Sequence, residues 1–293
     1  TGYSSLNKLF NLQSETYFSG TEAGAEKSLY QLNYKTNGDL RTKTVFLYGA
    51  GHLTADDKLV TEDTPLRQQV TYRYTGIQPN SSDFRKDEGE AAKNFNAFIG
   101  SVSTSSNASR MSITELLGDQ GVEKANRQIN LKLDGITART TVWFYYRNAD
   151  QSVVRATGAE EEAPLARQDT YRATTTPSAD KKSYIYGNDS VRGKLSETHF
   201  AGEQNAEKVD YILNFKSGGR DVKNFQVFFY GPGHSRAADG VNVNEDTALS
   251  VQRSFRMKPG MTTLPNLDKS RFTFADTGYS SLNKLFNLQS ETY

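Results

Sequence analysis

The sequence contains no cysteine, which excludes disulfide bonds, thiolate metal sites and cysteine nucleophiles together. It has only three histidines, so the commonest catalytic base is scarce. No run of about 18 apolar residues is present, and we therefore expect no membrane insertion by this segment. Basic and acidic residues nearly balance, 35 against 34, without a basic stripe or an acidic tail, which argues against a nucleic-acid partner.

The length and composition of the chain predict that it folds. Its 293 residues are enough for two or three domains, each with a core of its own. Hydrophobic residues make up only 35% of the chain, but aromatic residues reach 11%, which is too high for a disordered protein. We expect folded domains with modest cores.

The opening segment TGYSSLNKLFNLQSETY, residues 1–17, returns unchanged as residues 277–293. Many sequences can build any given strand, so a shared fold alone would have let the two copies drift apart. The identity indicates recent duplication or deliberate design, and the offset from position 1 to position 277 sets a period of 276. Because the chain starts with threonine and shows no charged-then-apolar leader, we expect it to be a window cut from a longer protein.

Inside this period, four landmarks recur three times in the same order. They are a short upstream segment (14–20, 114–121, 196–202), a Glu-Lys dipeptide (26–27, 123–124, 207–208), an aromatic segment (45–52, 142–149, 227–234) and a segment ending in an aromatic-Arg motif (64–74, 163–173, 247–257). One third of 276 is 92, so each copy, here called a module, has about 92 residues. The predicted boundaries are 1–80, 81–177 and 178–276, with 277–293 as the start of a fourth repeat. The linkers between modules are short, and neighbouring modules should therefore touch.

The segments after each Glu-Lys dipeptide alternate apolar and polar residues, which is typical of half-buried antiparallel strands. The alternating apolar residues are Leu32 and Tyr34 in module 1, Ile129, Leu131 and Leu133 in module 2, and Tyr211, Leu213 and Phe215 in module 3. Each segment ends in a tight-turn pair, Asn37-Gly38, Asp134-Gly135 or Gly218-Gly219. The pattern predicts a β-hairpin in every module.

Several short strands in about 92 residues predict an all-β fold of tandem immunoglobulin-like β-sandwich modules in an elongated array. Without a cysteine pair and its partner tryptophan, the modules would be immunoglobulin-like in architecture only. Helical spacing competes only at Leu6, Leu9 and Leu12 and in residues 86–100. Small α+β modules are the alternative.

Candidate sites are few, and each has an ordinary structural interpretation. His52 and His234 end matching G-x-G-H loops, but module 2 has Ala149 at that place, which favours turn residues over a catalytic pair. Residues 239–246 offer oxygen ligands without the spacing of a calcium loop, which favours a solvated acidic loop. We assign no catalytic, cofactor-binding or metal residue, expect no cofactor, and predict that the protein is not an enzyme.

A lysine and an asparagine recur six residues apart in each module, namely Lys27 and Asn33, Lys124 and Asn130, and Lys208 and Asn214. Some surface proteins of Gram-positive bacteria join a lysine and an asparagine in an intramolecular amide. On one strand they would be about 20 Å apart. Any such bond would need a partner from another strand.

The unchanged 276-residue period and its repeated layout of Glu-Lys, hairpin, aromatic strand and aromatic-Arg strand resemble the tandem-repeat stalk regions of long bacterial cell-surface adhesins and fibrillar surface proteins. The resemblance implies an extracellular spacer, anchored at the cell surface through regions outside this chain, that projects a distal binding domain. Its partners would be neighbouring modules of the same chain. Sandwiches of about 40 Å would then add roughly 100 Å per period.

Two other functions stay open at the level of sequence. The duplicated terminal segment could join subunits by strand exchange in a self-assembling filament or surface layer. Alternatively, the modules could bind a glycan or a protein of the host or cell surface, since several tyrosines could stack on sugars.

Overall fold

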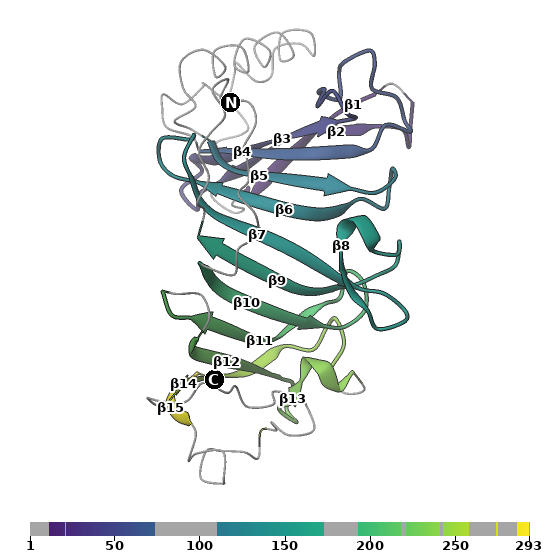
Figure 1. Ribbon diagram of the computed structural model, residues 1–293. Helices are drawn as coiled ribbons and strands as arrows, with labels where there is room; N and C mark the ends of the chain where they lie inside the picture. The colour runs from purple at the N-terminus through teal and green to yellow at the C-terminus, as the bar shows by residue number, and fades with distance from the viewer. Residues whose placement is uncertain are drawn as a thin grey trace. The chain divides into compact units, whose positions relative to one another are not determined.

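A computed structural model describes most of the chain (Figure 1). The described residues are 12–20, 22–73, 110–172, 193–217, 221–240, 243–257, 274 and 286–292. The chain forms two compact units, Thr1–Arg139 with Thr175–Tyr186, and Thr140–Thr174 with Gly187–Tyr293.

The first unit is an antiparallel sheet whose strands pair in the order in which they occur in the sequence. Its strands are β1 (Ser14–Ser19), β2 (Lys27–Tyr34), β3 (Leu40–Tyr48), β4 (Leu66–Arg73), β5 (Arg110–Leu117) and β6 (Lys124–Leu131). The first four belong to module 1 and the last two to module 2. The hydrogen-bonded ladder therefore continues across the module boundary.

The second unit repeats this arrangement with the remaining strands. The main strands are β7 (Ala138–Arg147), β9 (Leu165–Arg172), β10 (Lys194–Ala201), β11 (Lys208–Phe215), β12 (Val222–Tyr230), β14 (Leu249–Met257) and β15 (Phe286–Thr292). Short strands β8 (Val153–Arg155) and β13 (Ser235–Arg236) pair with β7 and β12, and each leads into a 3-10 turn, η2 (Ala156–Gly158) or η3 (Ala237–Asp239).

The predicted hairpins follow from their turn residues. Gly38 adopts a φ of 85°, which only glycine takes readily, and its amide donates to the carbonyl of Lys35 at 2.9 Å. The side chain of Asn37 accepts from the amide of Asp39 at 3.2 Å. This turn connects β2 to β3, and β11 pairs with β12 in the same way, which confirms both hairpins. Gly218-Gly219 lies outside the described residues.

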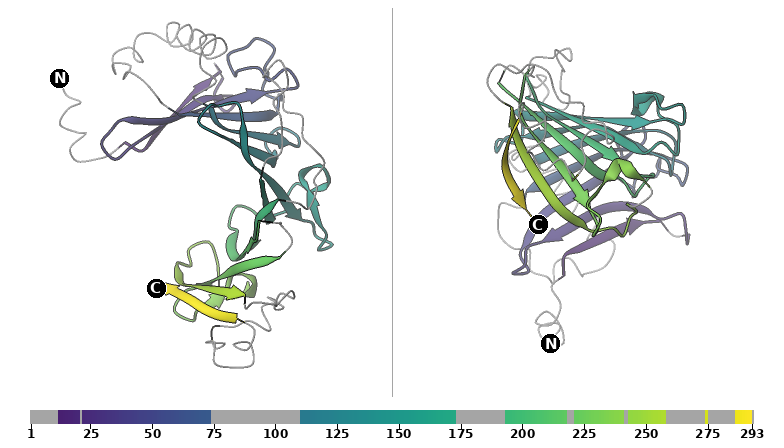
Figure 2. Two further views of the ribbon diagram at one scale, coloured as in Figure 1. Left: turned by 60° about the vertical axis from the view of Figure 1, so that its left-hand side comes forward. Right: turned by 90° about the horizontal axis from the view of Figure 1, so that it is seen from below.

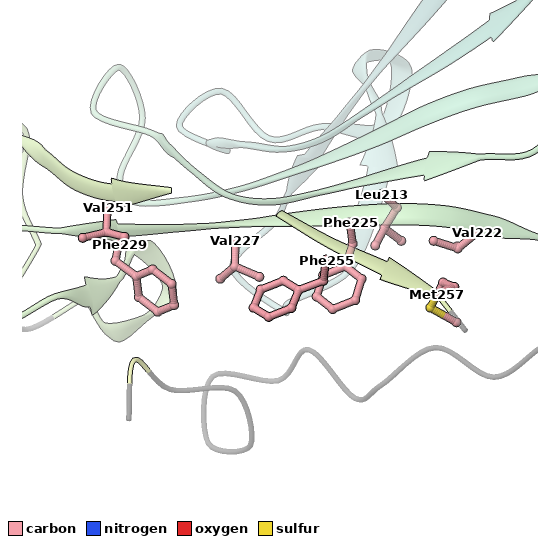
Figure 3. Close-up of a cluster of buried hydrophobic side chains, with 8 residues drawn as sticks. All are labelled: Leu213, Val222, Phe225, Val227, Phe229, Val251, Phe255 and Met257. Carbon is pink, nitrogen blue, oxygen red and sulfur yellow. The ribbon is translucent and has the colours of Figure 1, made fainter. Parts of the chain in front are cut away.

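The core of the second unit gathers apolar side chains from three neighbouring strands (Figure 3). Figure 3 shows Phe225, Val227 and Phe229 following one another along β12, as the period of two in a strand requires. Phe255 of β14 stacks on Phe225 with ring centroids 5.0 Å apart. Phe274 packs against the same cluster and meets the ring of Phe229 edge-on at 5.3 Å.

These observations confirm the all-β fold, but they do not confirm the tandem immunoglobulin-like sandwiches. In a sandwich each module would close as two packed sheets. Here the last strand of one module pairs with the first strand of the next, as the β4–β5 and β9–β10 ladders show. Neighbouring modules therefore touch, as predicted. The module boundaries at residues 80 and 177 divide the chain differently from the compact units and stay a prediction.

Several sequence-based expectations fall outside the described residues. These are the helical spacing at Leu6 and Leu9, the possible helix in residues 86–100, and the linkers. Leu12 is described and lies exposed, two residues before β1.

Candidate interfaces between the modules

Three antiparallel ladders join strands of successive modules, and their registers are equivalent. The ladders β4–β5, β9–β10 and β14–β15 place Thr71 opposite Ser112, Thr170 opposite Ser196 and Ser254 opposite Ser290. The strand β15 has the sequence of residues 10–16, so β14 meets a copy of the first strand of module 1. In both views of Figure 2, β15 (yellow) runs beside β14.

The pair that lies one residue before Thr71, Thr170 or Ser254 has different side chains in the three ladders. We call this pair the junction position. It holds Val70 opposite Ile113 in the first ladder, Asp169 opposite Glu197 in the second and Arg253 opposite Glu291 in the third. Val70, Ile113, Asp169 and Arg253 are all buried. Because burial penalises any unpaired charge, the residues facing each other must match.

In the first junction both facing residues are apolar, whereas in the second a lysine contacts both facing carboxylates. Asp169 is only 1% exposed, and Lys194 Nζ lies 2.9 Å from its Oδ2 and 2.7 Å from Glu197 Oε2. Arg167 Nε lies 3.1 Å from Asp169 Oδ1, and His199 Nε2 lies 2.5 Å from Glu197 Oε1. Two facing carboxylates are thus held together by the positive charge between them.

The pKa values in the second junction show the strength of this pairing. Burial pulls the pKa of Glu197 upward, but hydrogen bonds from His199 and Lys194 outweigh it and lower the pKa to about 2. Burial pulls the pKa of Lys194 downward, yet hydrogen bonds to Glu197 and Asp169 raise it above its usual value. Both groups are therefore held in their charged forms.

The third junction is a direct ion pair. Arg253 is 4% exposed, and its Nε donates to Glu291 Oε1 at 2.9 Å. Its Nη1 donates to the carbonyl of Phe274 at 2.9 Å, and the guanidinium lies 4.0 Å from the centre of the Phe274 ring. The charge is thus paired, hydrogen-bonded and covered by an aromatic face.

A second contact crosses the first two boundaries, made by the glutamate of the Glu-Lys dipeptide. Glu123 Oε1 accepts from the amide of Leu66, and Glu207 Oε1 accepts from the amide of Leu165, each at 2.8 Å. Each carboxylate therefore binds the first residue of the last strand of the preceding module. The dipeptide was visible in the sequence as a landmark, but its role depends on a partner 57 or 42 residues away.

The equivalent glutamate of module 1, Glu26, makes only the local part of this contact. Its Oε2 accepts from the amide of Gly24 at 2.7 Å, as Glu123 Oε2 accepts from Gly121 at 2.9 Å. No strand of a preceding module lies beside β1 in the described residues, where β1 pairs with β2 alone. The outer edge of β1 is open there.

Among the described residues, only part of the outer edge of β14 is paired. β15 pairs with Gln252–Met257 and stops short of the first residues of β14. Leu249, the first of these, is 51% exposed. Within the described ranges, the amide of Leu249 has no glutamate opposite it of the kind that binds Leu66 and Leu165.

The two histidines of the G-x-G-H loops lie in turns. His52 and His234 have φ values of 50° and 51°, as expected for turn residues. Pairing places Trp143, not Val142, at the position of Val45 and Val227, because Trp143 faces Asp169 as those residues face Val70 and Arg253. The sequence alignment that put Ala149 at the histidine position was therefore shifted by one residue.

The recurring lysines of modules 1 and 3 donate to backbone carbonyls. Lys27 Nζ donates to the carbonyl of Thr64 and Lys208 Nζ to that of Glu245, both at 2.9 Å. Asn33 donates to Thr42 Oγ1 at 3.2 Å. These lysines therefore bind the loop that leads into the last strand of their own module.

In the acidic loop, Asp239 accepts from the amide of Arg236 at 2.8 Å. Within the described ranges, no group of three or more His, Asp or Glu side chains could hold a metal ion. No described helix is long and apolar enough to cross a membrane.

Comparison of the chain with protein-family models and with the sequences of characterised proteins found no match.

Proposed function

We propose that the chain is a structural segment of a long extracellular surface protein and acts as a spacer that projects a distal binding domain. The observation that supports this most is the repeated ladder between modules. β14 meets a copy of the first strand in the register by which β4 meets β5 and β9 meets β10. The same joint can thus be repeated at each period.

Such a spacer needs mechanical continuity and no reactive pocket. Each ladder adds backbone hydrogen bonds across a module boundary, and each contains a matched pair with at least one buried member. In a repeat array, stability is roughly the sum of module terms and nearest-neighbour interface terms. Reach would then increase with copy number at a constant increment.

Strand pairing between modules also predicts a different length per period from that of sandwiches joined end to end. Neighbouring strands lie about 4.8 Å apart, so four main strands extend an array by about 20 Å per module and about 60 Å per period. Sandwiches joined end to end would add roughly 100 Å.

The test is a length series of one, two and three periods measured by small-angle X-ray scattering. The spacer predicts a constant increment in maximum dimension of about 60 Å per period, from the spacing of paired strands. An Arg253→Glu change in every period should make the increment irregular, and adding the matching Glu→Arg change at the residue 291 position should restore it. A maximum dimension that barely grows with added periods would refute the spacer. Labelling of intact cells with an antibody against the chain tests the extracellular location.

A further inference from the structure

The three modules carry a matching set of side chains on the face of the sheet that points away from the core. Side chains alternate between the two faces along a strand, so the neighbours of a buried residue point outward. On the last strand of each module, the outward side chains are a glutamine, a hydroxyl residue and an arginine. They are Gln69, Thr71 and Arg73 on β4, Gln168, Thr170 and Arg172 on β9, and Gln252, Ser254 and Arg256 on β14. Surface substitutions usually change stability little, so folding alone does not explain this agreement.

A phenylalanine on the neighbouring strand lies opposite each of these glutamines. The registers pair Phe46 with Gln69, Phe144 with Gln168 and Phe228 with Gln252. Figure 3 shows Phe225, Val227 and Phe229 in the core, so the intervening Phe228 points away from it. All three paired phenylalanines are partly exposed. We call each group of phenylalanine, glutamine, hydroxyl residue and arginine an outer patch.

No carboxylate in the outer patches offsets the charge of their arginines. The carboxylates of the described strands are already engaged by tyrosine, lysine or arginine side chains, and these partners do not include Arg73, Arg172 or Arg256. Arg73 is partly exposed and the other two are exposed, and none of the three forms an ion pair with another described residue. The patches therefore offer positive charge to an anionic ligand.

We propose that the outer patches bind an acidic polysaccharide, an activity that goes beyond the spacer and does not depend on it. Its sugar rings stack on the phenylalanines, and its carboxylates or sulfates pair with the arginines. The glutamine and the hydroxyl residue between them both donate and accept hydrogen bonds, as sugar hydroxyls do. Phenylalanine and arginine lie four residues apart along the strands, or about 14 Å, which a single sugar ring cannot span. The ligand is therefore an extended chain.

The composition of the patches favours a polysaccharide over a single-stranded nucleic acid. Proteins that bind single strands also combine aromatic stacking with cations, but they track a phosphate at every nucleotide with a positively charged groove. The last strand of each outer patch presents one cation and two uncharged hydrogen-bonding residues. This suits a chain that is rich in hydroxyl groups and carries fewer charges.

The spacing of the patches in the second unit suits a polymer. The patches of modules 2 and 3 end on β9 and β14, and the ladder between these strands runs through β10, β11 and β12. Four steps of about 4.8 Å separate them by about 19 Å. One polysaccharide chain that contacts both patches gains affinity because the second contact is intramolecular.

The experiment uses the full chain in native electrophoresis through gels that contain a polysaccharide. The probes are alginate and polygalacturonate, which carry carboxylates, and dextran sulfate, which carries sulfates. Gels with unmodified dextran or with single-stranded oligothymidylate run in parallel. We expect retardation by at least one of the three acidic polysaccharides and none by dextran or oligothymidylate. The concentration dependence of the retardation gives the dissociation constant.

Two triple variants of equal charge test the arginines. The first removes the patch cations and should bind at least about tenfold more weakly. It is Arg73→Gln/Arg172→Gln/Arg256→Gln. The second removes the exposed lysine that follows the second strand of each module and should bind within about threefold of the unchanged chain. It is Lys35→Gln/Lys132→Gln/Lys216→Gln.

A third variant tests the stacking. Leucine in place of each patch phenylalanine keeps an apolar side chain but removes the ring. Affinity should fall by about threefold or more. The variant is Phe46→Leu/Phe144→Leu/Phe228→Leu, and its circular dichroism should match that of the unchanged chain.

Failure of all three acidic polysaccharides to retard the unchanged chain would overturn the proposal, whatever the variants do. An equal loss of affinity in the arginine and lysine variants would overturn it as well, because it would show unspecific attraction to net charge. Stronger retardation by oligothymidylate than by any polysaccharide would point to a nucleic acid instead. The length series contains no polysaccharide, so failure of this binding and failure of the spacer are distinguishable.

Discussion

The strongest stability prediction concerns Arg236 and Asp210, a buried ion pair in module 3. Their side chains form two hydrogen bonds, Nε to Oδ1 at 2.8 Å and Nη2 to Oδ2 at 2.5 Å. Arg236 is 1% exposed and Asp210 is 5% exposed. Pairing places the buried Leu29 of module 1 at the Asp210 position and Thr54 at the Arg236 position. Module 1 therefore has uncharged residues at the two positions that form the ion pair in module 3.

The perturbation is Arg236→Thr, Asp210→Leu and the double change. Each single change leaves one buried charge without its partner and should cost about 3–5 kcal/mol of the free energy of unfolding. The double change removes both charges, so it should cost far less than the sum of the two. The coupling energy in the double-mutant cycle should then exceed about 2 kcal/mol.

The assay is urea denaturation followed by the fluorescence of Trp143. This is the only tryptophan in the chain, and it lies in the second unit, as Arg236 and Asp210 do. Changes in the midpoint at constant slope report stability. A double variant that loses the sum of the two single losses would refute the reasoning, since it would mean that the two charges do not compensate one another.

Three further predictions address other parts of the fold. Burial lowers the pKa of Lys43 from 10.5 to about 7, so the folded state loses its proton before the unfolded state does, and stability of the first unit should rise from pH 7 to pH 9. Lys43→Met should flatten that rise in thermal melts and stabilise the unit at pH 6 by at most about 5 kcal/mol, at about 1.4 kcal/mol per pH unit. Glu123→Gln keeps an acceptor oxygen and should lower the free energy of unfolding by less than about 1 kcal/mol, whereas Glu123→Ala should lower it by about 1–3 kcal/mol. Glu123→Ala should also speed hydrogen exchange of the Leu66 amide. Equal exchange rates in the two variants would contradict the hydrogen bond between Glu123 and Leu66. Gly202→Ala should destabilise the second unit by more than about 1 kcal/mol, because φ is 125° and a Cβ would lie 2.8 Å from the Ala206 carbonyl oxygen. Gly24→Ala, where φ is 89° and a Cβ meets nothing within 4 Å, is the control and should cost less in melts that follow the first unit.

Local features of the fold were predictable from the sequence because they depend on neighbouring residues. Asn37-Gly38 predicted a turn, and the alternation around Leu32 and Leu213 predicted strands with one buried face. The same alternation does not say whether the face is covered by a second sheet or by other parts of the chain. That is why the sandwich was expected where strands of adjacent modules pair instead.

The interfaces were harder to predict because their chemistry is distributed over two modules. Val70, Asp169 and Arg253 occupy one position of one landmark, yet they look unrelated until their partners Ile113, Glu197 and Glu291 are known. Glu123 and Glu207 stood out as repeated residues, but only the ladders reveal which amide each one binds. Lys43 gave no signal, although Phe225 takes the same place in module 3.

The three unlike junction positions limit how a gene for such a protein can change in length. Loss of module 2 by unequal recombination would pair β4 with β10 and place Val70 opposite Glu197. Loss of module 3 would pair β9 with a copy of the first strand and place Asp169 opposite another glutamate. Losing or gaining a whole period restores Arg253 opposite glutamate. In the proposed spacer, copy number should therefore change in steps of a complete period and not of a single module.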